Sequence, residues 1–507
     1  MAKITEKFKK DFEENSEKVT PNLTFDTNKL EDNTPLIKPK KSVAKKVTII
    51  VCSSLAALLT LVIVVPVATF YFSSLRESSS VKTYQKRYSI NEIKIAENNS
   101  FKKLNNIAYP DQTIPTESEI NEEEKAAYNH FLEATYKAVF QEEKDNLSYA
   151  TIGLYSILNN LEYAVSNAPI KAQFNDLLGL NEEERIAFYQ KMMLANSYAQ
   201  DNNTIQLKNS AFFSNDYVYN PSYIAFLSKV YSEAYQLDFK KESNKIVEWV
   251  NQAVNEKNFI DQKFLDLDNE TCLYLFSTYY FKNAWLYKYL QNKNIVDDFY
   301  LRNGQIVQAE YMRHNFSISQ YYDYDTYVSF KDYYAGGFAS ITYLIPKSSS
   351  DDILELTKEA NIFVEDEEKA AYGQEIEDYP GHYSNIMVDL QTPKFNNKAD
   401  LDFKNALSSL GFEDIYNRGI NTFGNAFADL YEDSNFYLQT LKQRNAVTFN
   451  EDGTTIKSVT MAEVGSTKAA PTYSTLEVKL NQPFIYIIRD INDTPVFVGH
   501  LDNPLIN

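Results

Sequence analysis

The carboxy-terminal part of the chain alternates apolar segments with one long polar stretch, and this order limits the fold more than any other feature. The sequence Glu-Asp-Gly-Thr at 451–454 opens the polar stretch, and an apolar segment runs from Pro483 to Arg489. A second apolar segment, 494–499, leads to Asn503-Pro504. Short apolar runs bounded by Pro, Gly and Asn are typical of buried strands. The pattern therefore predicts a long polar loop that is anchored at its far end by two strands of the core.

Composition sets outer limits on fold and function. The chain has 507 residues, of which 44% are hydrophobic, and this is enough for a substantial core. The formal charge of −19 argues against a nucleic-acid partner, because binding to phosphates needs clustered Lys and Arg. An acidic surface of this kind mainly favours solubility.

Cysteine and histidine are too scarce to suggest metal or hydrolase chemistry. The two cysteines, Cys52 and Cys272, cannot supply a disulfide framework. The four histidines are His130, His314, His382 and His500. No nucleophile, base and orienting group can be nominated together, so we expect no catalytic residue, no metal, no cofactor and no enzymatic activity.

Residues 47–72 form an uncharged run rich in Val, Leu and Ile that is long enough to span a bilayer. The run follows 46 mostly polar residues and exceeds the usual apolar length of a cleavable signal peptide, so an anchor is favoured. Lipoprotein processing at Cys52 is disfavoured, because this residue lies near the start of the run. Basic residues near the run are slightly more numerous on its amino-terminal side than on its carboxy-terminal side, which predicts a single-pass protein with its amino terminus inside.

The chain divides into four predicted parts. Residues 1–46 mix charges of both signs and are expected to form a disordered cytoplasmic tail, residues 47–72 a transmembrane helix, and residues 73–116 a polar stalk. The folded domain is expected at 117–507. Helical patterns come first in this domain, at 126–140, 152–164 and 226–235. Apolar strand patterns dominate later, at 272–281, 484–488 and 496–498. This order predicts an α+β fold.

Seven motifs in order, over roughly 117–507, resemble those of the serpin family. Two are the hinge at 451–454 and the carboxy-terminal strands. The others are 146–152, similar to the family's Phe-Ser-Pro-x-Ser-Ile sequence, then 177–180, 246–251, 276–285 and 393–395, which is Pro-Lys-Phe. Tyr149 stands where Pro is usual, and Thr151 stands where Ser is usual. The number and order of the motifs carry the resemblance.

The resemblance implies a serpin fold with about three β-sheets, eight or nine helices and an exposed reactive loop. In this family a protease cleaves the loop, which then inserts as a new strand into the main sheet and distorts the trapped protease. The implied hinge residues are Glu451, Asp452, Gly453, Thr454, Ile456 and Ser458. The implied shutter and breach residues are Ser148, Thr151, Gln443 and Trp285, with Gln443 at the position of the family's shutter histidine, so that this hydrogen-bond cluster must be rebuilt or absent.

The polar stretch has the phase of a strand that can enter a sheet. It contains no proline from Thr454 to Ala470, and with Thr454 facing inward both Lys457 and Glu463 face outward. A one-residue slip would bury these two charges at a cost on the order of several kcal/mol. The alternation therefore favours one register of insertion.

Two features depart from the inhibitory members of the family. Ile456 is β-branched where small residues are usual, and the stretch from 451 to 483 is longer than typical. The family's usual spacing from Gly453 places the reactive bond between Thr467 and Lys468. One residue later, Lys468 would be the recognition residue for a trypsin-like protease.

Two functions remain open from the sequence. The first is a membrane-tethered, monomeric serpin whose domain is extracellular at the cell membrane and inhibits serine or cysteine proteases by suicide cleavage and loop insertion. Its partners are the target protease and, through 47–72, the membrane. The second is a non-inhibitory serpin-fold module for surface binding or adhesion, in which the loop is only a connection.

Overall fold

The computed structural model describes residues 92–108, 120–140, 146–200, 203–348, 351–358, 360–377, 379–431, 434–454 and 474–506. All of them belong to the second of two compact units, which begins at Glu77. The predicted tail and the transmembrane run 47–72 lie outside the described residues. Among the helices that are described, none is long and apolar enough to cross a membrane.

The described residues form nine α-helices, in the number expected from the resemblance: α3 (Glu122–Phe140), α4 (Thr151–Ala164), α5 (Ala168–Leu178), α6 (Glu182–Ala195), α7 (Pro221–Lys229), α8 (Phe239–Ala253), α9 (Gln262–Leu265), α10 (Ile353–Thr357) and α11 (Lys404–Ser409). Local signals start several of them. Asn181 and Glu184 form a capping box at α6, and Asn220 caps α7 ahead of a proline. Every residue of α4 except Tyr163 is buried, so this helix runs through the core.

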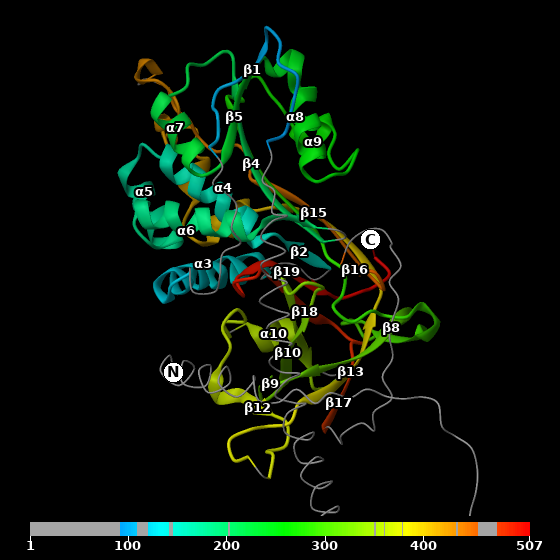
Figure 1. The fold of residues 1–507 in the computed structure, drawn as a ribbon. Coiled ribbons are helices and arrows are strands. Elements are labelled where there is room, and N and C mark those ends of the chain that lie inside the picture. Colours follow the sequence, from blue (N-terminus) through cyan, green and yellow to red (C-terminus); the bar gives the residue numbers. More distant parts are fainter. Residues whose placement is uncertain are drawn as a thin grey trace, which may run out of the picture. The chain divides into compact units, whose positions relative to one another are not determined.

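The main sheet consists of two groups of strands. In the first, β6 (Leu273–Lys282) pairs with β4 (Asn203–Ser214), whose other side holds β5 (Ser232–Leu237) and β3 (Ser197–Gln200). In the second, β14 (Phe395–Asp402) pairs with β15 (Lys442–Asn450), which also holds the short β16 (Gly453–Thr454). An isolated bridge from Asn283 to Thr454 connects the two groups. Figure 1 shows α4 and α8 on opposite sides of this sheet.

Two further sheets complete the unit. One contains seven strands in the order β12 (Ala370–Tyr372), β9 (Gln320–Asp323), β10 (Tyr327–Tyr333), β11 (Ser340–Pro346), β18 (Phe484–Arg489), β19 (Pro495–Leu501) and β2 (Leu147–Tyr149). The other contains β17 (Ser474–Lys479), β13 (Ile386–Pro393), β8 (Ile306–Ile318) and β7 (Ile295–Tyr300). All residues of β18 and β19 are buried. The expected α+β class is confirmed, and the carboxy-terminal strands lie in its core.

An additional strand, β1 (Phe101–Lys103), extends the main sheet at β5, where Phe101 pairs with Leu237. Residues 92–108 fall within the range that the sequence assigned to a polar stalk. Phe101 is fully buried, and together with Ile95 it joins the apolar cluster under α8. Asn98 Oδ1 accepts hydrogen bonds from the backbone N–H groups of Ser100 and Phe101 and so forms the turn before the strand. The folded unit therefore includes residues from this range.

The turn between β18 and β19 holds a buried carboxylate. Asp490 Oδ1 accepts hydrogen bonds from the N–H groups of Asn492 (2.9 Å) and Thr494 (3.0 Å), and Oδ2 accepts one from Asn196 Nδ2 at 2.8 Å. Burial raises the pKa of Asp490 from its ordinary 3.8 to about 6, because these hydrogen bonds offset the loss of water only in part.

This shift predicts a pH-dependent stability. A carboxyl whose pKa is raised by folding has no effect on stability below its unfolded pKa; the fold loses stability as the pH rises from the unfolded pKa to the folded pKa, and the loss is complete above both. Relative to Asp490→Asn, the wild type should lose about 3 kcal/mol as the pH rises from about 4 to about 7. Unfolding midpoints of the two chains over this range test the prediction, and parallel pH profiles would contradict it.

Candidate functional site: an open slot in the main sheet

The main sheet is open between β6 and β15. Hydrogen bonds to β4 occupy one edge of β6, and those to β14 occupy one edge of β15. From the bridge between Asn283 and Thr454 back to the first residues of β6 and β15, the facing edges share no strand pairing within the described residues. The edge of a sheet is a template for another strand. The arrangement thus forms a slot, here defined as the gap between β6 and β15.

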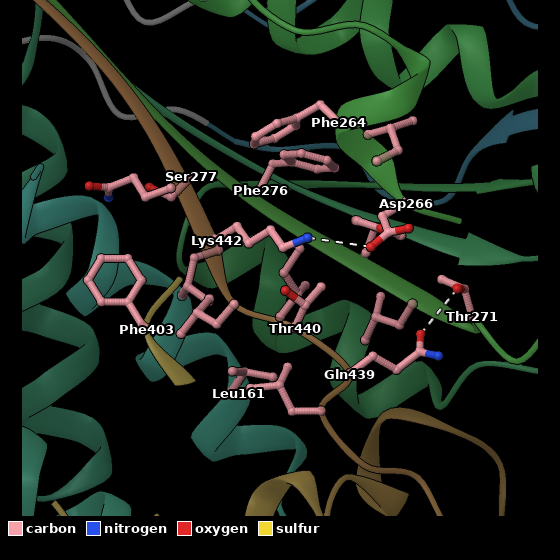
Figure 2. A pocket seen from close by; sticks show the side chains of 18 of the residues that line it. Leu161, Phe264, Asp266, Thr271, Phe276, Ser277, Phe403, Gln439, Thr440 and Lys442 are labelled. Atoms are coloured by element: carbon pink, nitrogen blue, oxygen red, sulfur yellow. Dashed lines mark hydrogen bonds and ion pairs between the residues drawn. The ribbon is translucent and has the colours of Figure 1, made fainter. Parts of the chain in front are cut away.

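A cavity of about 560 Å³ lies in the slot, with α4 as part of its lining. Figure 2 shows Leu161, Phe403, Ser277 and Thr440 around it. Both hydroxyl oxygens, Ser277 Oγ and Thr440 Oγ1, are buried without a hydrogen-bond partner among the described residues. Buried polar groups are usually paired, so these two are free to bond to an incoming segment.

The end of the slot at the bridge from Asn283 to Thr454 is called its upper end, and the end at the first residues of β6 and β15 its lower end. The upper end holds the start of the hinge. Thr454 donates its N–H to Asn283 O at 3.0 Å and accepts a hydrogen bond from Asn283 N at 3.2 Å. The Thr454 hydroxyl lies 2.7 Å from Tyr334 Oη, and Thr454 is only 2% exposed. Trp285 stacks on Tyr334 with ring centroids 5.0 Å apart and donates Nε1–H to Asn450 O at 2.8 Å. The sequence-predicted Trp285 and Thr454 are therefore brought together.

Gly453 and Glu451 fix the approach of the chain to this point. Gly453 has φ +139°, and a Cβ atom built on it would lie 2.1 Å from Asn283 O. Glu451 is buried and forms an ion pair with Lys394 at 3.1 Å. Burial by itself raises the pKa of Glu451, but hydrogen bonds from its own backbone, Asn294 and Lys394 outweigh this effect and hold it below its ordinary value. Asp452 is exposed.

The middle of the slot contains the predicted shutter residues. Gln443 Oε1 accepts from Ala150 N at 2.8 Å, and Gln443 Nε2 donates to Ala150 O at 3.1 Å. Asn445 Nδ2 donates to Ser148 O at 2.9 Å, and Thr151 Oγ1 donates to Pro495 O at 3.1 Å. A glutamine-centred network thus occupies the place where the resemblance implies a histidine.

Sequence reasoning missed several residues of the slot. Asn445 contacts the shutter and Tyr334 contacts the hinge. In the sequence, the only signal for either residue is a polar group within a strand-like segment. The predicted hinge residues Ile456 and Ser458 and the predicted reactive-bond residues Thr467 and Lys468 lie outside the described residues.

The chemistry of the described part offers no reactive centre in the slot. Cys272 is a free thiol, and burial raises its pKa to about 12, which disfavours the thiolate. Within the ranges described, no group of three or more His, Cys, Asp and Glu side chains could hold a metal ion.

The close approach at Gly453 generates a prediction. Gly453→Ala should expel the hinge from the top of the slot, because the new methyl group would collide with backbone and the positive φ disfavours alanine. We expect a loss of about 2 kcal/mol or more and a change in Trp285 fluorescence.

Gly411→Ala is the matched control, since Gly411 also has a positive φ (+90°) but has no atom within 4 Å of the added Cβ. An unchanged Trp285 emission in Gly453→Ala, with the same stability loss as the control, would refute the predicted clash.

Comparisons with known proteins agree with this geometry. The profile of the family described as "Serpin (serine protease inhibitor)" matches residues 126–504. Serpin-Z2B of Triticum aestivum is 24% identical over 392 residues, covering 72% of this chain and 91% of that protein, and neuroserpin of Mus musculus is 22% identical over 407 residues, covering 78% and 92%. The crystal structure of the thermophilic serpin tengpin in its native state superposes with a TM-score of 0.62 at 20% identity, covering 76% of this chain and 95% of that one. The chain belongs to the serpin family.

Proposed function

We propose that this serpin is a membrane-tethered inhibitor of extracellular serine or cysteine proteases, acting as a monomer through suicide cleavage and insertion of its reactive loop. The observation that carries the proposal is the slot, whose upper end holds Thr454 and whose two edges share no strand pairing with each other among the described residues. Membership of a family described as protease inhibitors supports protease targets in general. The tether and the extracellular location rest on the uncharged run 47–72 alone.

The pairing of the hinge predicts where each following residue would enter the slot. Thr454 pairs with Phe449 on β15 and with Asn283 beside β6. Each step along the inserting strand is then one step back along both walls, because the new strand is antiparallel to them. The inward residues and their neighbours on β15 and β6 would be Ile456 with Val447 and Phe281, Ser458 with Asn445 and Tyr279, and Thr460 with Gln443 and Ser277.

This register gives Ile456 an apolar site. Val447 and Phe281 are both buried, at 5% and 9% exposure, so a β-branched side chain between them would meet apolar neighbours. Thr460 would lie beside the unpartnered hydroxyl of Ser277. Both placements favour insertion over the alternative of a non-inhibitory binding module.

Incubation of the full-length protein in mild detergent with a panel of serine and cysteine proteases tests the proposal. We expect a complex that withstands denaturant and has the summed mass, together with a cleaved form that melts far above the intact one, because insertion completes the sheet. Clean cleavage with active protease left over and an unchanged melting temperature would support the non-inhibitory module instead. Mass spectrometry of the complex identifies the cleaved bond and thus tests Thr467-Lys468.

The tether needs its own test. In sealed cells that express the full chain, protease added outside should digest the domain, and the protein should remain with the membrane after alkaline extraction. Release by alkali would exclude an anchor at 47–72, and protection from protease would exclude the extracellular location.

Inward and outward positions of the loop should respond differently to charge. Thr460→Lys would place an ammonium group in the slot over α4, at a cost of several kcal/mol, and should abolish both the complex and the gain in melting temperature after cleavage. Val459→Lys, one residue earlier, would face outward and should preserve both. Equal behaviour of the two variants would disprove the register.

A further inference from the structure

Side chains bridge the lower end of the slot. One wall contributes Asp266, Asp268 and Thr271 from the segment that connects α9 to β6, and the other contributes Gln439 and Lys442 at the start of β15. Thr271 Oγ1 donates to Gln439 Oε1 at 3.1 Å, and Gln439 Nε2 donates to Asp268 Oδ2 at 3.0 Å. Lys442 Nζ lies 3.4 Å from Asp266 Oδ2. Figure 2 shows the contacts of Lys442 with Asp266 and of Thr271 with Gln439 across the slot. These five residues are called the lower latch.

Neighbouring contacts reinforce the lower latch. Arg444 Nη1 donates to Phe259 O at 3.2 Å, and the Arg444 guanidinium lies 4.5 Å from the centre of the Phe264 ring. Tyr437 Oη donates to Glu270 Oε2 at 2.6 Å. The segment 259–271 is therefore attached to the opposite wall at several points along its length.

The lower latch lies at a defined depth of the slot. In the register set by Thr454 and Phe449, Met461 would lie opposite Lys442 and Val464 would lie opposite Gln439. A strand that advances as far as Thr460 would separate the two walls, β6 and β15, only as far as the region around Gln443. A strand that advances beyond Thr460 would have to separate Lys442 from Asp266, and one that advances to Val464 would also have to separate Gln439 from Thr271.

We propose that the lower latch is a checkpoint that separates partial from complete insertion, with Gln439 and Lys442 as positioning residues that set the rate of the last step. This inference rests on the proposed function. The contacts are exposed and individually weak: Lys442 is 37% and Asp266 74% exposed. Weak contacts suit a checkpoint, because they delay the strand without forming a permanent barrier. The sum of the contacts should slow complete insertion by roughly tenfold.

The test follows insertion in the full-length protein in mild detergent. The loop is nicked by a brief pulse of trypsin, the protease is quenched, and the fraction of molecules with the raised melting temperature is measured over time. The double variant Gln439→Ala/Lys442→Ala should complete insertion roughly tenfold faster than the wild type, and it should need fewer inhibitor molecules per protease inhibited. The charge swap Asp266→Lys/Lys442→Asp should restore most of the delay lost in Lys442→Ala.

Lys369→Ala is the matched control, because it removes an exposed ion pair with Asp325 (3.1 Å) beside β12, outside the slot. If the double variant inserts at the rate of the wild type and of this control, the checkpoint is refuted while the proposed function stands. If the charge swap stays as fast as Lys442→Ala, the ion pair has no part in the delay. A wild-type chain that gains no thermal stability after nicking overturns the proposed function and the checkpoint together.

Discussion

Two strand edges that face each other without pairing are the constraint on which the rest of the structure depends. Among the described residues β6 and β15 do not pair with each other, and a further strand could pair with both edges. At the upper end, contacts among described residues hold the hinge in place. Thr454 occupies the first position, Tyr334 bonds to its hydroxyl, and Trp285 covers the junction. If the proposed insertion takes place, it begins at the hinge.

The middle of the slot depends on one amide. A glutamine side chain offers a donor and an acceptor at once, so Gln443 satisfies both the N–H and the C=O of Ala150. An imidazole at this position could gain a proton near neutral pH, whereas an amide does not titrate. The contact between β15 and the start of α4 is thus independent of pH. Asp490 and Glu451, whose pKa values are shifted by their surroundings, lie outside this contact.

The sequence predicted those parts of the slot that are marked by local pattern. The buried strands β18 and β19 are continuous apolar runs, the hinge residue Gly453 has a positive φ, and Thr454, which the sequence interpretation took as the first inward residue, is buried. It did not predict contacts that depend on long-range packing. β1 is a short strand in a polar segment, and its apolar residues are too few to produce a period. The partners in the lower latch are polar residues far apart in the chain, and nothing in their local sequence indicates that they meet.

The pairing of β1 with β5 has a mechanical consequence. Strands β6, β4, β5 and β1 are joined edge to edge, so the wall of the slot that carries β6 is continuous with the amino-terminal part of the chain. If residues 47–72 hold the chain in a membrane, tension on the tether would load the contacts of residues 92–103 with this wall, among them the hydrogen bond from Ile93 N to Glu233 Oε1 and the three residue pairs from Phe101 to Lys103. The paired strands β1 and β5 would then move together with β6 whenever the slot widens. A surface that restrains the tether would thereby add to the work of opening the sheet.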